Sequence, residues 1–417
     1  MKQNCIVFVE ASTTGAGEVA CAYAKRIGLT VVLMSREPDH YDERILKHCD
    51  IAIAVDTTSA FAVVNRVADI ASHYVIAGVA TTSDFHVVQA AVLAARLGLP
   101  GNRPRAVATI KNKFKMREAV GRIAPALNPA YALEYTFEGA CRFAQAVGFP
   151  VVVKPLTGND SLHVRRISDA DALRAYFAAR PHWGLDASGQ DFAHGVLVEE
   201  VIGGTEYSLD LLRAVGGELL PIGAFSKRIA GEKTGNFIKI GASFPACASD
   251  TERLVDAIVP IVDALGFAVG AIDIDCKIVD GQVKILEMNP RLVGDQMGSH
   301  MIEMATGQNP AHAIVDVACG RPLRWTPTHN RGVAIHRLTM PRSGYFQGIT
   351  NADELKRCRG VEAINELGVK GRWIEMARSN QEVVGSIIVS HASADEAMTL
   401  AANLAEKADI RVECARA

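Results

Sequence analysis

Residues 270–294 read GAIDIDCKIVDGQVKILEMNPRLVG, the stretch with the clearest structural pattern in the chain. Apolar residues dominate both halves, and the Asp280-Gly281 pair between them is a strong signal for a hairpin turn. The stretch therefore predicts two strands that run antiparallel and are joined by a tight turn.

Polar side chains interrupt these two strands near their ends. Asp275 lies near the end of the first strand, Glu287 and Asn289 lie near the end of the second, and Arg291 follows two residues later. Oxygen ligands without His or Cys suit Mg²⁺, and a neighbouring arginine suits a phosphate or a carboxylate. A solvated hairpin with ordinary surface charges is the alternative. Acidic residues inside apolar strands, followed by Asn-Pro-Arg, favour the metal site.

The composition is that of an ordinary globular protein. The chain has 417 residues, which is enough for two or three domains, with 49% hydrophobic and 22% charged residues. A formal net charge of -2 gives no indication of nucleic-acid binding or of an anionic membrane surface. We find no apolar run long enough for a membrane span and no signal-peptide pattern. The nine cysteines form no C-x-x-C pair, so we expect reduced thiols and a cytoplasmic protein.

Residues 1 to about 100 alternate between strand and helix patterns, which predicts a parallel α/β unit. The expected strands lie at 5–9, 30–34, 51–55 and 74–79, and the expected helices at 17–28, 59–72 and 85–97. The loop Ser12–Gly17 joins the first strand to the first helix. It could hold an anion on backbone N–H groups, but it is not G-x-G-x-x-G, so a tight turn is the favoured interpretation.

Two lysines follow the boundary marked by the prolines and glycine of residues 99–104. Lys113 lies in a charged segment that we expect to open a helix, and Lys154 ends an apolar strand. The loop Leu156–Leu162, with Ser161 as its candidate ligand, could close over phosphates through backbone N–H groups. This loop has too few glycines for a P-loop, and a plain hairpin loop is the alternative.

The middle and the end of the chain continue with strands. Residues 196–210 predict a strand, a tight turn and a second strand, and Ser226–Gly235 predicts a polar, mobile loop. Its cations Lys227, Arg228 and Lys233 could meet a second carboxylate or a phosphate, although solvated charges are favoured. Residues 322–330 predict a linker, and the remainder an α+β unit without an evident catalytic cluster.

These separated pieces, taken in order, resemble the ATP-grasp superfamily of carboxylate–amine ligases. Residues 1 to about 320 resemble its three consecutive subdomains, and the remainder resembles the C-terminal domain of the L-amino-acid (dipeptide) ligase branch. The resemblance implies an α/β and α+β fold with a Rossmann-like pre-ATP-grasp domain over 1–100. It implies an ATP-grasp domain over 101–325, with a lid subdomain at about 130–200, and a C-terminal α+β domain over 326–417.

The resemblance also implies a role for individual residues. By position, Lys113 and Lys154 contact the nucleotide phosphates, and Glu206 binds the ribose. The adenine is contacted by the segment that contains Glu199, Glu200 and Ile202. The magnesium ions are bound by Asp275, Glu287 and Asn289, and the substrate carboxylate by Arg291, with Gly294 lining the same pocket. Arg291 is the implied catalytic residue, because it would also stabilise the tetrahedral intermediate.

The implied activity is ATP-dependent amide formation through an acyl phosphate, with Mg²⁺ or Mn²⁺ and with release of ADP and phosphate. The expected partners are small carboxylates and amines, above all amino acids, and the resemblance allows a homodimer. Three features depart from the family pattern: Asp275 in place of the more usual Glu, a single glycine in the phosphate loop, and residues 241–245, GASFP, where dipeptide ligases often have a histidine. The last departure weakens the transfer of dipeptide specificity.

Three alternatives stay open at this point. The acyl donor could be a carboxylate other than an amino acid, as in secondary metabolism. The protein could be a nucleotide-binding sensor without catalysis, although intact Asp275, Glu287, Asn289 and Arg291 argue against it. A nicotinamide dehydrogenase built on residues 1–100 has little support, because the dinucleotide fingerprint is missing.

Overall fold

A computed structural model describes residues 2–414 of the chain. It begins with a sheet of four parallel strands in the order β3-β2-β1-β4, as the alternating strand and helix patterns predicted. The strands are β1 (Asn4–Val9), β2 (Thr30–Ser35), β3 (Ile51–Ala54) and β4 (Val75–Ala80). Burial of β1 and β2 on both faces explains their nearly continuous apolar sequences.

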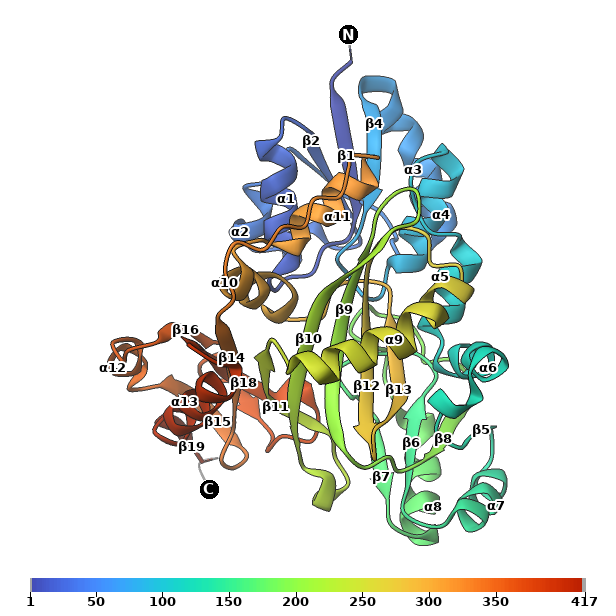
Figure 1. Ribbon diagram of the computed structural model, residues 1–417, viewed down its shortest axis with the longest axis vertical. Helices are drawn as coiled ribbons and strands as arrows, with labels where there is room; N and C mark the ends of the chain where they lie inside the picture. The colour runs from blue at the N-terminus through green and yellow to red at the C-terminus, as the bar shows by residue number, and fades with distance from the viewer. Residues whose placement is uncertain (1, 415–417) are drawn as a thin grey trace.

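Helices cover both faces of this parallel sheet (Figure 1). On one face α3 (Ala60–His73) and α4 (Val87–Leu97) pack against β1 and β2. On the other face α1 (Ala16–Arg26) packs together with α11 (Pro310–Ala318), which returns from far along the chain. A hydrogen bond from Tyr23 Oη to Asp316 Oδ2, 2.9 Å long, joins α1 to the end of α11. The predicted division at residues 100 and 325 stays a prediction, since α11 packs on the first unit.

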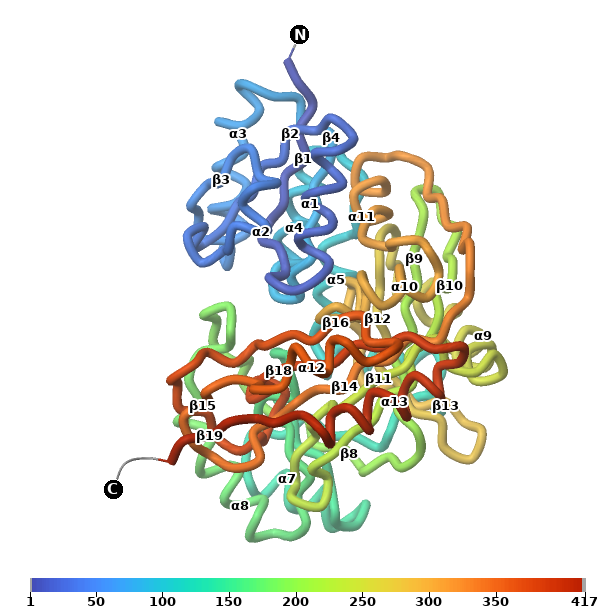
Figure 2. Tube along the Cα trace, turned by 90° about the vertical axis from the view of Figure 1, so that its left-hand side faces the viewer, coloured from blue at the N-terminus to red at the C-terminus, as the bar shows by residue number. Residues whose placement is uncertain are grey.

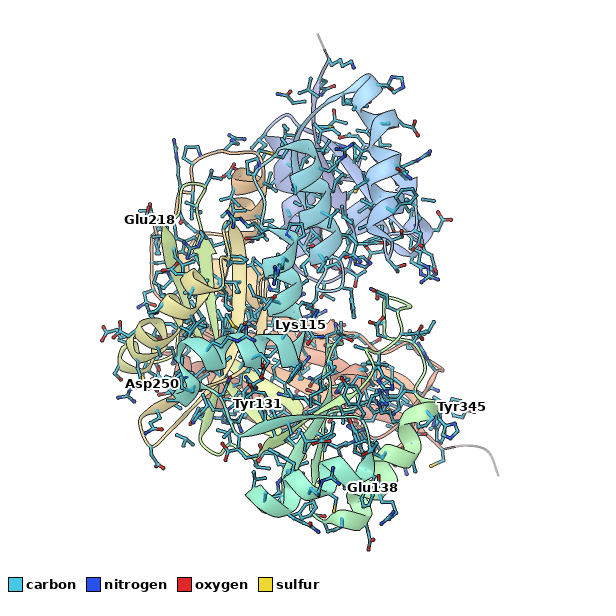
Figure 3. All side chains as sticks on the ribbon, turned by 90° about the vertical axis from the view of Figure 1, so that its right-hand side faces the viewer. Lys115, Tyr131, Glu138, Glu218, Asp250 and Tyr345 are labelled. Atoms are coloured by element: carbon cyan, nitrogen blue, oxygen red, sulfur yellow. The ribbon has the colours of Figure 1, made fainter. Side chains whose placement is uncertain are left out.

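A second sheet, of four antiparallel strands in the order β5-β8-β6-β7, forms a separate layer that we call the lid. Its strands are β5 (Tyr131–Glu134), β6 (Val151–Pro155), β7 (Arg165–Ile167) and β8 (Val196–Glu200). Helices α7 (Phe137–Val147) and α8 (Ala170–Ala179) share one apolar core with these strands. The sequence did not lead us to expect β7 or α8. Figure 3 places Glu138 of the lid and Tyr345 of the C-terminal part at the end of the molecule away from the N-terminus.

The largest sheet has eight strands, all antiparallel to their neighbours, in the order β13-β12-β9-β10-β11-β14-β18-β16. Its strands are β9 (Thr205–Arg213), β10 (Leu219–Ala230), β11 (Ile238–Phe244), β12 (Gly270–Val279), β13 (Gln282–Asn289), β14 (Gly332–Thr339), β16 (Val361–Glu366) and β18 (Val383–His391). The hairpin predicted from residues 270–294 is confirmed as β12 and β13. Asp280 and Gly281 have φ values of 47° and 76°, as a two-residue turn of this kind requires.

Three of the C-terminal strands, β14, β16 and β18, continue this sheet, and the others form a small sheet of their own. β14 pairs with β11, so the linker after α11 leads the chain directly back to the central sheet. Helix α9 (Ala248–Ala264) covers one part of the sheet and α13 (Ala394–Glu406) another, as Figures 1 and 2 show. The remaining elements are α2 (Glu43–Leu46), α5 (Pro104–Lys111), α6 (Lys113–Ile123), α10 (Ile302–Thr306), α12 (Ala352–Lys356), and the small sheet of β15 (Gly344–Ile349), β17 (Trp373–Ile374) and β19 (Ile410–Glu413).

The prediction of a polar, mobile loop over residues 226–235 is wrong. Strand β10 extends to Ala230, and a short 3₁₀ turn over Glu232–Thr234 leads into β11. The side chain of Lys227 is only 3% exposed and forms an ion pair with Asp275 of the neighbouring hairpin. Because an opposite charge on another strand neutralises this lysine, a polar sequence can form part of a buried strand.

Candidate functional site

Two cavities meet where the lid faces the largest sheet. The larger has a volume of about 830 Å³ and lies between loops of the parallel sheet, the lid and the eight-stranded sheet. The smaller, of about 160 Å³, lies between the lid strands and the hairpin β12–β13. Seven residues line both cavities and so mark their junction: Asn159, Ser161, Lys227, Lys239, Asp275, Glu287 and Asn380.

The structure brings together Ser161 and every residue to which the family resemblance gave a role, whereas Arg228 and Lys233 line neither cavity. The smaller cavity is lined by Lys113, Lys154, Ser161, Glu199, Glu200, Ile202, Glu206, Asp275 and Glu287. The larger cavity is lined by Asn289, Arg291 and Gly294, and also by Asp275 and Glu287. The loop Ser12–Gly17 also reaches the larger cavity, through Ser12 and its neighbours.

A buried ion triad forms one wall of the smaller cavity. Glu199 Oε1 lies 2.6 Å from Arg117 Nε, and Glu199 Oε2 lies 2.6 Å from Lys154 Nζ. Burial raises the pKa of Glu199, but the charges of Arg117 and Lys154 outweigh it, so the pKa lies below its usual value. Burial lowers the pKa of Lys154 despite this partner. The side chain of Glu199 therefore holds β8 against α6 and β6.

The segment between β8 and β9 is fixed by lysine and carboxylate contacts. Glu200 Oε1 accepts a hydrogen bond of 2.8 Å from the Ala130 amide, and the Ile202 carbonyl accepts one of 3.0 Å from Lys277 Nζ. Glu206 follows at the start of β9, 3.9 Å from Lys227 Nζ, and burial raises its pKa. These contacts make the segment a rigid edge of the smaller cavity.

The hairpin β12–β13 presents four polar side chains on one face. Asp275 is the cross-strand partner of Glu287, and Asp273 is the partner of Asn289, which places directly opposed side chains within reach of one another. Asp275 pairs with Lys227, and Glu287 Oε1 lies 2.8 Å from Lys113 Nζ.

Two observations bear on whether this face fits a cation. Among the described residues, no group of three or more His, Cys, Asp and Glu is arranged to hold a metal ion, so Asn289 is needed to complete a set with Asp275 and Glu287. Asn289 Oδ1 is buried and has no hydrogen-bond partner in the part of the chain that the structure describes. A buried acceptor without a donor is unfavourable by itself, and a hard cation would satisfy it. The oxygen donor set therefore fits Mg²⁺.

Arg291 is held between two buried aspartates. Its Nη1 lies 2.8 Å from Asp273 Oδ2, and its Nε lies 3.2 Å from Asp84 Oδ1. Burial lowers the pKa of Arg291, but Asp84 and Asp273 outweigh burial and raise it overall. Asp84 comes from the loop after β4 and also pairs with Lys111 at the end of α5. This network joins the parallel sheet to the hairpin.

Sequence reasoning missed several residues of this site. Asp273 was visible as the first acid of I-D-I-D, and Lys111 and Arg117 lie in the charged segment around Lys113 but were given no role. Asp84 lies in a segment without a distinguishing pattern. The sequence shows no evident catalytic cluster in the C-terminal part, but Arg337 and Asn380 of this part line the larger cavity. No signal in the sequence identifies these last two, since only the continuous sheet brings them to the site.

Asn380 holds the loop 156–162 that connects β6 to β7 and that we call the phosphate loop after its predicted role. Its amide donates a 3.1 Å hydrogen bond to the Asp160 carbonyl, and its Nδ2 donates a 3.4 Å bond to Ser161 Oγ. Asp160 and Ser161 have φ values of 55° and 56°, in a region that is costly for residues other than glycine. External contacts of this kind stabilise a strained loop conformation. On the other side of the lid, Arg36 Nη1 donates a 3.3 Å bond to the Ser188 carbonyl.

Three family models match successive parts of the chain. One described as "ATP-grasp N-terminal domain" matches residues 21–101, and one described as "ATP-grasp domain" matches residues 147–300. A third, described as "L-amino acid ligase C-terminal domain 2", matches residues 336–413. None of the helices over residues 2–414 combines the length and the apolar character of a membrane span.

Similar proteins and structures were found for nearly the whole chain. An uncharacterized protein of Sinorhizobium fredii is 23% identical over 414 residues, which cover 98% of this chain and 83% of that protein. Carnosine synthase 1 of Gallus gallus is 28% identical over 249 residues, which cover 57% of this chain but only 26% of the synthase. The crystal structure of L-amino acid ligase from Bacillus licheniformis matches with a TM-score of 0.81 at 20% identity, covering 99% of this chain and 100% of that one.

A second solved structure contains a nucleotide. It is the biotin carboxylase domain of 2-oxoglutarate carboxylase from Hydrogenobacter thermophilus in complex with MgADP, with a TM-score of 0.70 at 18% identity, covering 99% of this chain and 91% of that one. At these identities the likenesses establish the fold: an N-terminal parallel sheet followed by antiparallel central and C-terminal parts.

Proposed function

Because the chain belongs to the ATP-grasp superfamily of ADP-forming ligases and carries the C-terminal domain of L-amino acid ligases, we propose that it joins an amino acid to an amine. The product is a dipeptide or a dipeptide-like amide, and ATP is converted to ADP and phosphate. The C-terminal family match and the likeness to the Bacillus licheniformis ligase support this substrate class. The match to carnosine synthase 1, named for its product, adds support over part of the chain.

In this proposal ATP occupies the smaller cavity and its γ-phosphate lies at the junction. Lys113 and Lys154, which line this cavity, neutralise the phosphate oxygens. Residues 199–202 contact the adenine mainly through their backbone, since the side chain of Glu199 is already engaged in the ion triad. Glu206 accepts hydrogen bonds from the ribose, and Ser161 closes over the phosphates from the lid.

Asp275, Glu287 and Asn289 hold magnesium in this scheme. Magnesium held by these three residues would supply positive charge that lowers the repulsion between ATP and the attacking carboxylate. Lys113 and Lys227 at present neutralise Glu287 and Asp275. Against the effect of burial, the charge of Lys227 lowers the pKa of Asp275 and so favours its ionised form, and both lysines are close enough to the junction to contact phosphate as well.

The carboxylate to be activated lies in the larger cavity beside Arg291. Its oxygen attacks the γ-phosphorus, the bond to the β–γ bridging oxygen breaks, and ADP leaves. The amine nitrogen then attacks the acyl carbon of the acyl phosphate, the bond to the phosphate oxygen breaks, and inorganic phosphate leaves. Asp84 and Asp273 fix the guanidinium of Arg291 so that its remaining N–H groups meet the oxyanion.

An acyl phosphate hydrolyses if water reaches it, so the site must be closed during the reaction. The lid loops 156–162 and 185–189 border the larger cavity, and both are held by contacts with other parts of the fold. Asn380 and Arg36 are the residues that provide these contacts. We assign the exclusion of water to these two loops.

One observation carries the proposal: cationic side chains and the oxygen ligands of the hairpin meet at the junction of the two cavities. The test is phosphate release from ATP with panels of carboxylates and amines. Release with no amino-acid donor would overturn the amino-acid version and favour the alternative of another carboxylate. Binding of ATP without turnover on any pair would favour a sensor.

Arg291 gives a sharper test of the assigned carboxylate site. Arg291→Lys keeps a cation between Asp84 and Asp273 but cannot make the same forked contacts. We expect amide formation to fall by about 100-fold, the size of the loss of one oxyanion donor, with ATP affinity within about twofold of wild type. Arg291→Ala leaves two buried carboxylates without a partner and therefore also destabilises the fold, so thermal unfolding is measured alongside. Retained turnover in both variants would mean that the site is wrongly assigned.

A further inference from the structure

Three cations from adjacent strands of the largest sheet line the larger cavity: Lys227 of β10, Lys239 of β11 and Arg337 of β14. Lys227 pairs with Asp275 and Arg337 pairs with Asp295. Lys239 differs from both, because no described residue supplies its ammonium group with a hydrogen-bond or ion-pair partner. Burial and the charges of Arg337 and Lys227 lower the pKa of Lys239 well below its usual value.

The backbone at Lys239 is held in place although its ammonium group is not. The Lys239 amide donates a 2.8 Å hydrogen bond to Asn380 Oδ1, and its carbonyl accepts a 3.4 Å bond from Arg337 Nη1. Two residues of the C-terminal part therefore position one lysine of the central sheet. A positioned, half-buried cation without a counter-ion is unfavourable in the free protein, and an anionic ligand removes that penalty.

We propose that Lys239 and Arg337 bind the carboxylate of the incoming amine substrate, so that the nucleophile is an amino acid and not a simple amine. This inference rests on the proposed ligase function and specifies its second substrate. Arg337 is suited to the role because its guanidinium has five donors, and Asp295 together with the Lys239 carbonyl leaves several of them available. Lysine provides a compact positive charge, and the planar guanidinium of arginine can donate two parallel hydrogen bonds to the same carboxylate.

Arg337 sets this carboxylate apart from the phosphates, whereas Lys239 lines both cavities and so lies at their junction, beside the proposed position of the γ-phosphate. Lys113 and Lys154 line only the smaller cavity, whereas Arg337 lines only the larger one. Arg291 also faces the larger cavity, but it comes from the hairpin end and is held by Asp84 and Asp273. The larger cavity thus offers two cationic positions on different elements, one for the carboxylate that is activated and one for the carboxylate that identifies the amine.

The experiment compares three nucleophiles with one fixed acyl donor: L-alanine, L-alaninamide and hydroxylamine. Only L-alanine carries a carboxylate, and hydroxylamine reports formation of the acyl phosphate because it yields a hydroxamate. We expect wild type to use L-alanine with a KM at least about tenfold below that of L-alaninamide, in line with the loss of one charged hydrogen bond. In Lys239→Gln the KM for L-alanine should rise roughly 10- to 100-fold, with hydroxamate formation and the KM for ATP within about twofold of wild type.

Two further variants control the interpretation. Arg337→Lys should retain more of the preference for L-alanine than Arg337→Gln does. Lys233→Gln removes an exposed lysine of the 3₁₀ turn that lines neither cavity, and it should leave all three nucleophiles unchanged. Thermal unfolding and binding of an ATP analogue establish that each variant is folded.

Several outcomes would overturn the inference. A rise in the KM for ATP with an unchanged KM for L-alanine would make Lys239 a phosphate ligand. An equal loss with all three nucleophiles would place Lys239 at the acyl donor, and a wild type that uses L-alaninamide as well as L-alanine would show that no such carboxylate site exists. Absence of phosphate release with every pair refutes the proposed function instead. In that case, calorimetric titration of L-alanine into the protein, with an ATP analogue and Mg²⁺ present, still tests the carboxylate site. Equal affinities of wild type and Lys239→Gln for L-alanine would overturn it.

Discussion

Replacement of Glu199 by glutamine tests the wall of the proposed nucleotide cavity. Its carboxylate lies 2.6 Å from both Arg117 Nε and Lys154 Nζ, and its side chain is only 4% exposed. Glutamine has nearly the same shape but carries no charge, and its NH₂ group must face one of the two cations. The variant therefore leaves two buried cations with no counter-ion. Removing one partner of a buried ion pair destabilises a protein more than replacing both partners by apolar residues.

The size of the effect follows from the geometry. Two unit charges about 4 Å apart interact by about 4 kcal/mol at an effective dielectric constant near 20. Measured losses on removing one partner of a buried pair are about 3–5 kcal/mol. We expect Glu199→Gln to lower the free energy of opening of the lid by about 3–5 kcal/mol. The exposed Glu218, labelled in Figure 3, provides the matched control, and Glu218→Gln should change it by less than about 0.5 kcal/mol.

Hydrogen exchange of peptides that contain β6 and β8 measures this opening directly. The affinity for an ATP analogue is a second measurement, and its expected change with pH has a definite direction. Burial already lowers the pKa of Lys154, and loss of the Glu199 charge lowers it further, so less of the lysine is protonated as the pH rises. ATP affinity of the variant should therefore fall more steeply with rising pH than that of wild type. A loss of opening free energy below about 1 kcal/mol, or the same pH dependence as wild type, would refute the reasoning.

Three further predictions concern the hairpin, the phosphate loop and a buried acid. Glu287→Gln should raise the Mg²⁺ concentration for half-maximal activity roughly 10- to 100-fold or remove activity, and an unchanged Mg²⁺ dependence would contradict the metal assignment. Asn380→Ala removes two side-chain hydrogen bonds, each worth about 0.5–1.5 kcal/mol. The KM for ATP should therefore rise several-fold, and more ATP should be hydrolysed without amide formation. A wild-type KM, with one amide formed for each ATP consumed, would count against the loop contact. Burial and the neighbouring Asp273 raise the pKa of Asp210 far above its usual value. A carboxyl group with a raised folded-state pKa stabilises the fold below its unfolded-state pKa and loses this contribution as the pH rises towards the folded-state pKa. Asp210→Asn should therefore gain Tm over wild type as the pH rises above about 4, the ordinary carboxyl pKa, and a constant or shrinking difference would show that Asp210 is charged in the fold.

The parts of the fold that the sequence predicted are those with local signals. The hairpin at residues 270–294 has both an alternating pattern and a turn dipeptide whose φ values the structure reproduces. The parallel sheet has apolar runs separated by helical periods, and the runs are clearest in β1 and β2, which are buried on both faces. Strand β7 and helix α8 were not predicted, since a strand of three residues and a helix of ten give little periodic signal.

The parts of the site that were not predicted depend on contacts between distant segments. Lys227 is polar in a polar stretch and becomes part of a strand only because Asp275 of another strand neutralises it. Asp84 and Arg337 are single charges whose partners lie on other elements of the fold. A charge whose partner is far away in sequence looks like an ordinary surface charge until the topology is known.

The continuity of the eight-stranded sheet gives the C-terminal part its place in the proposed reaction. β14 pairs with β11, so Arg337 is held at a fixed distance from the strand that carries Lys239. The turn with Asn380 binds both the backbone of Lys239 and the phosphate loop of the lid. A closed phosphate loop and a formed carboxylate site therefore share one side chain, and each should stabilise the other because binding energies linked through a common contact are reciprocal. In this scheme an amino acid in the larger cavity favours lid closure over ATP, and phosphoryl transfer is then fastest when the correct amine is already bound.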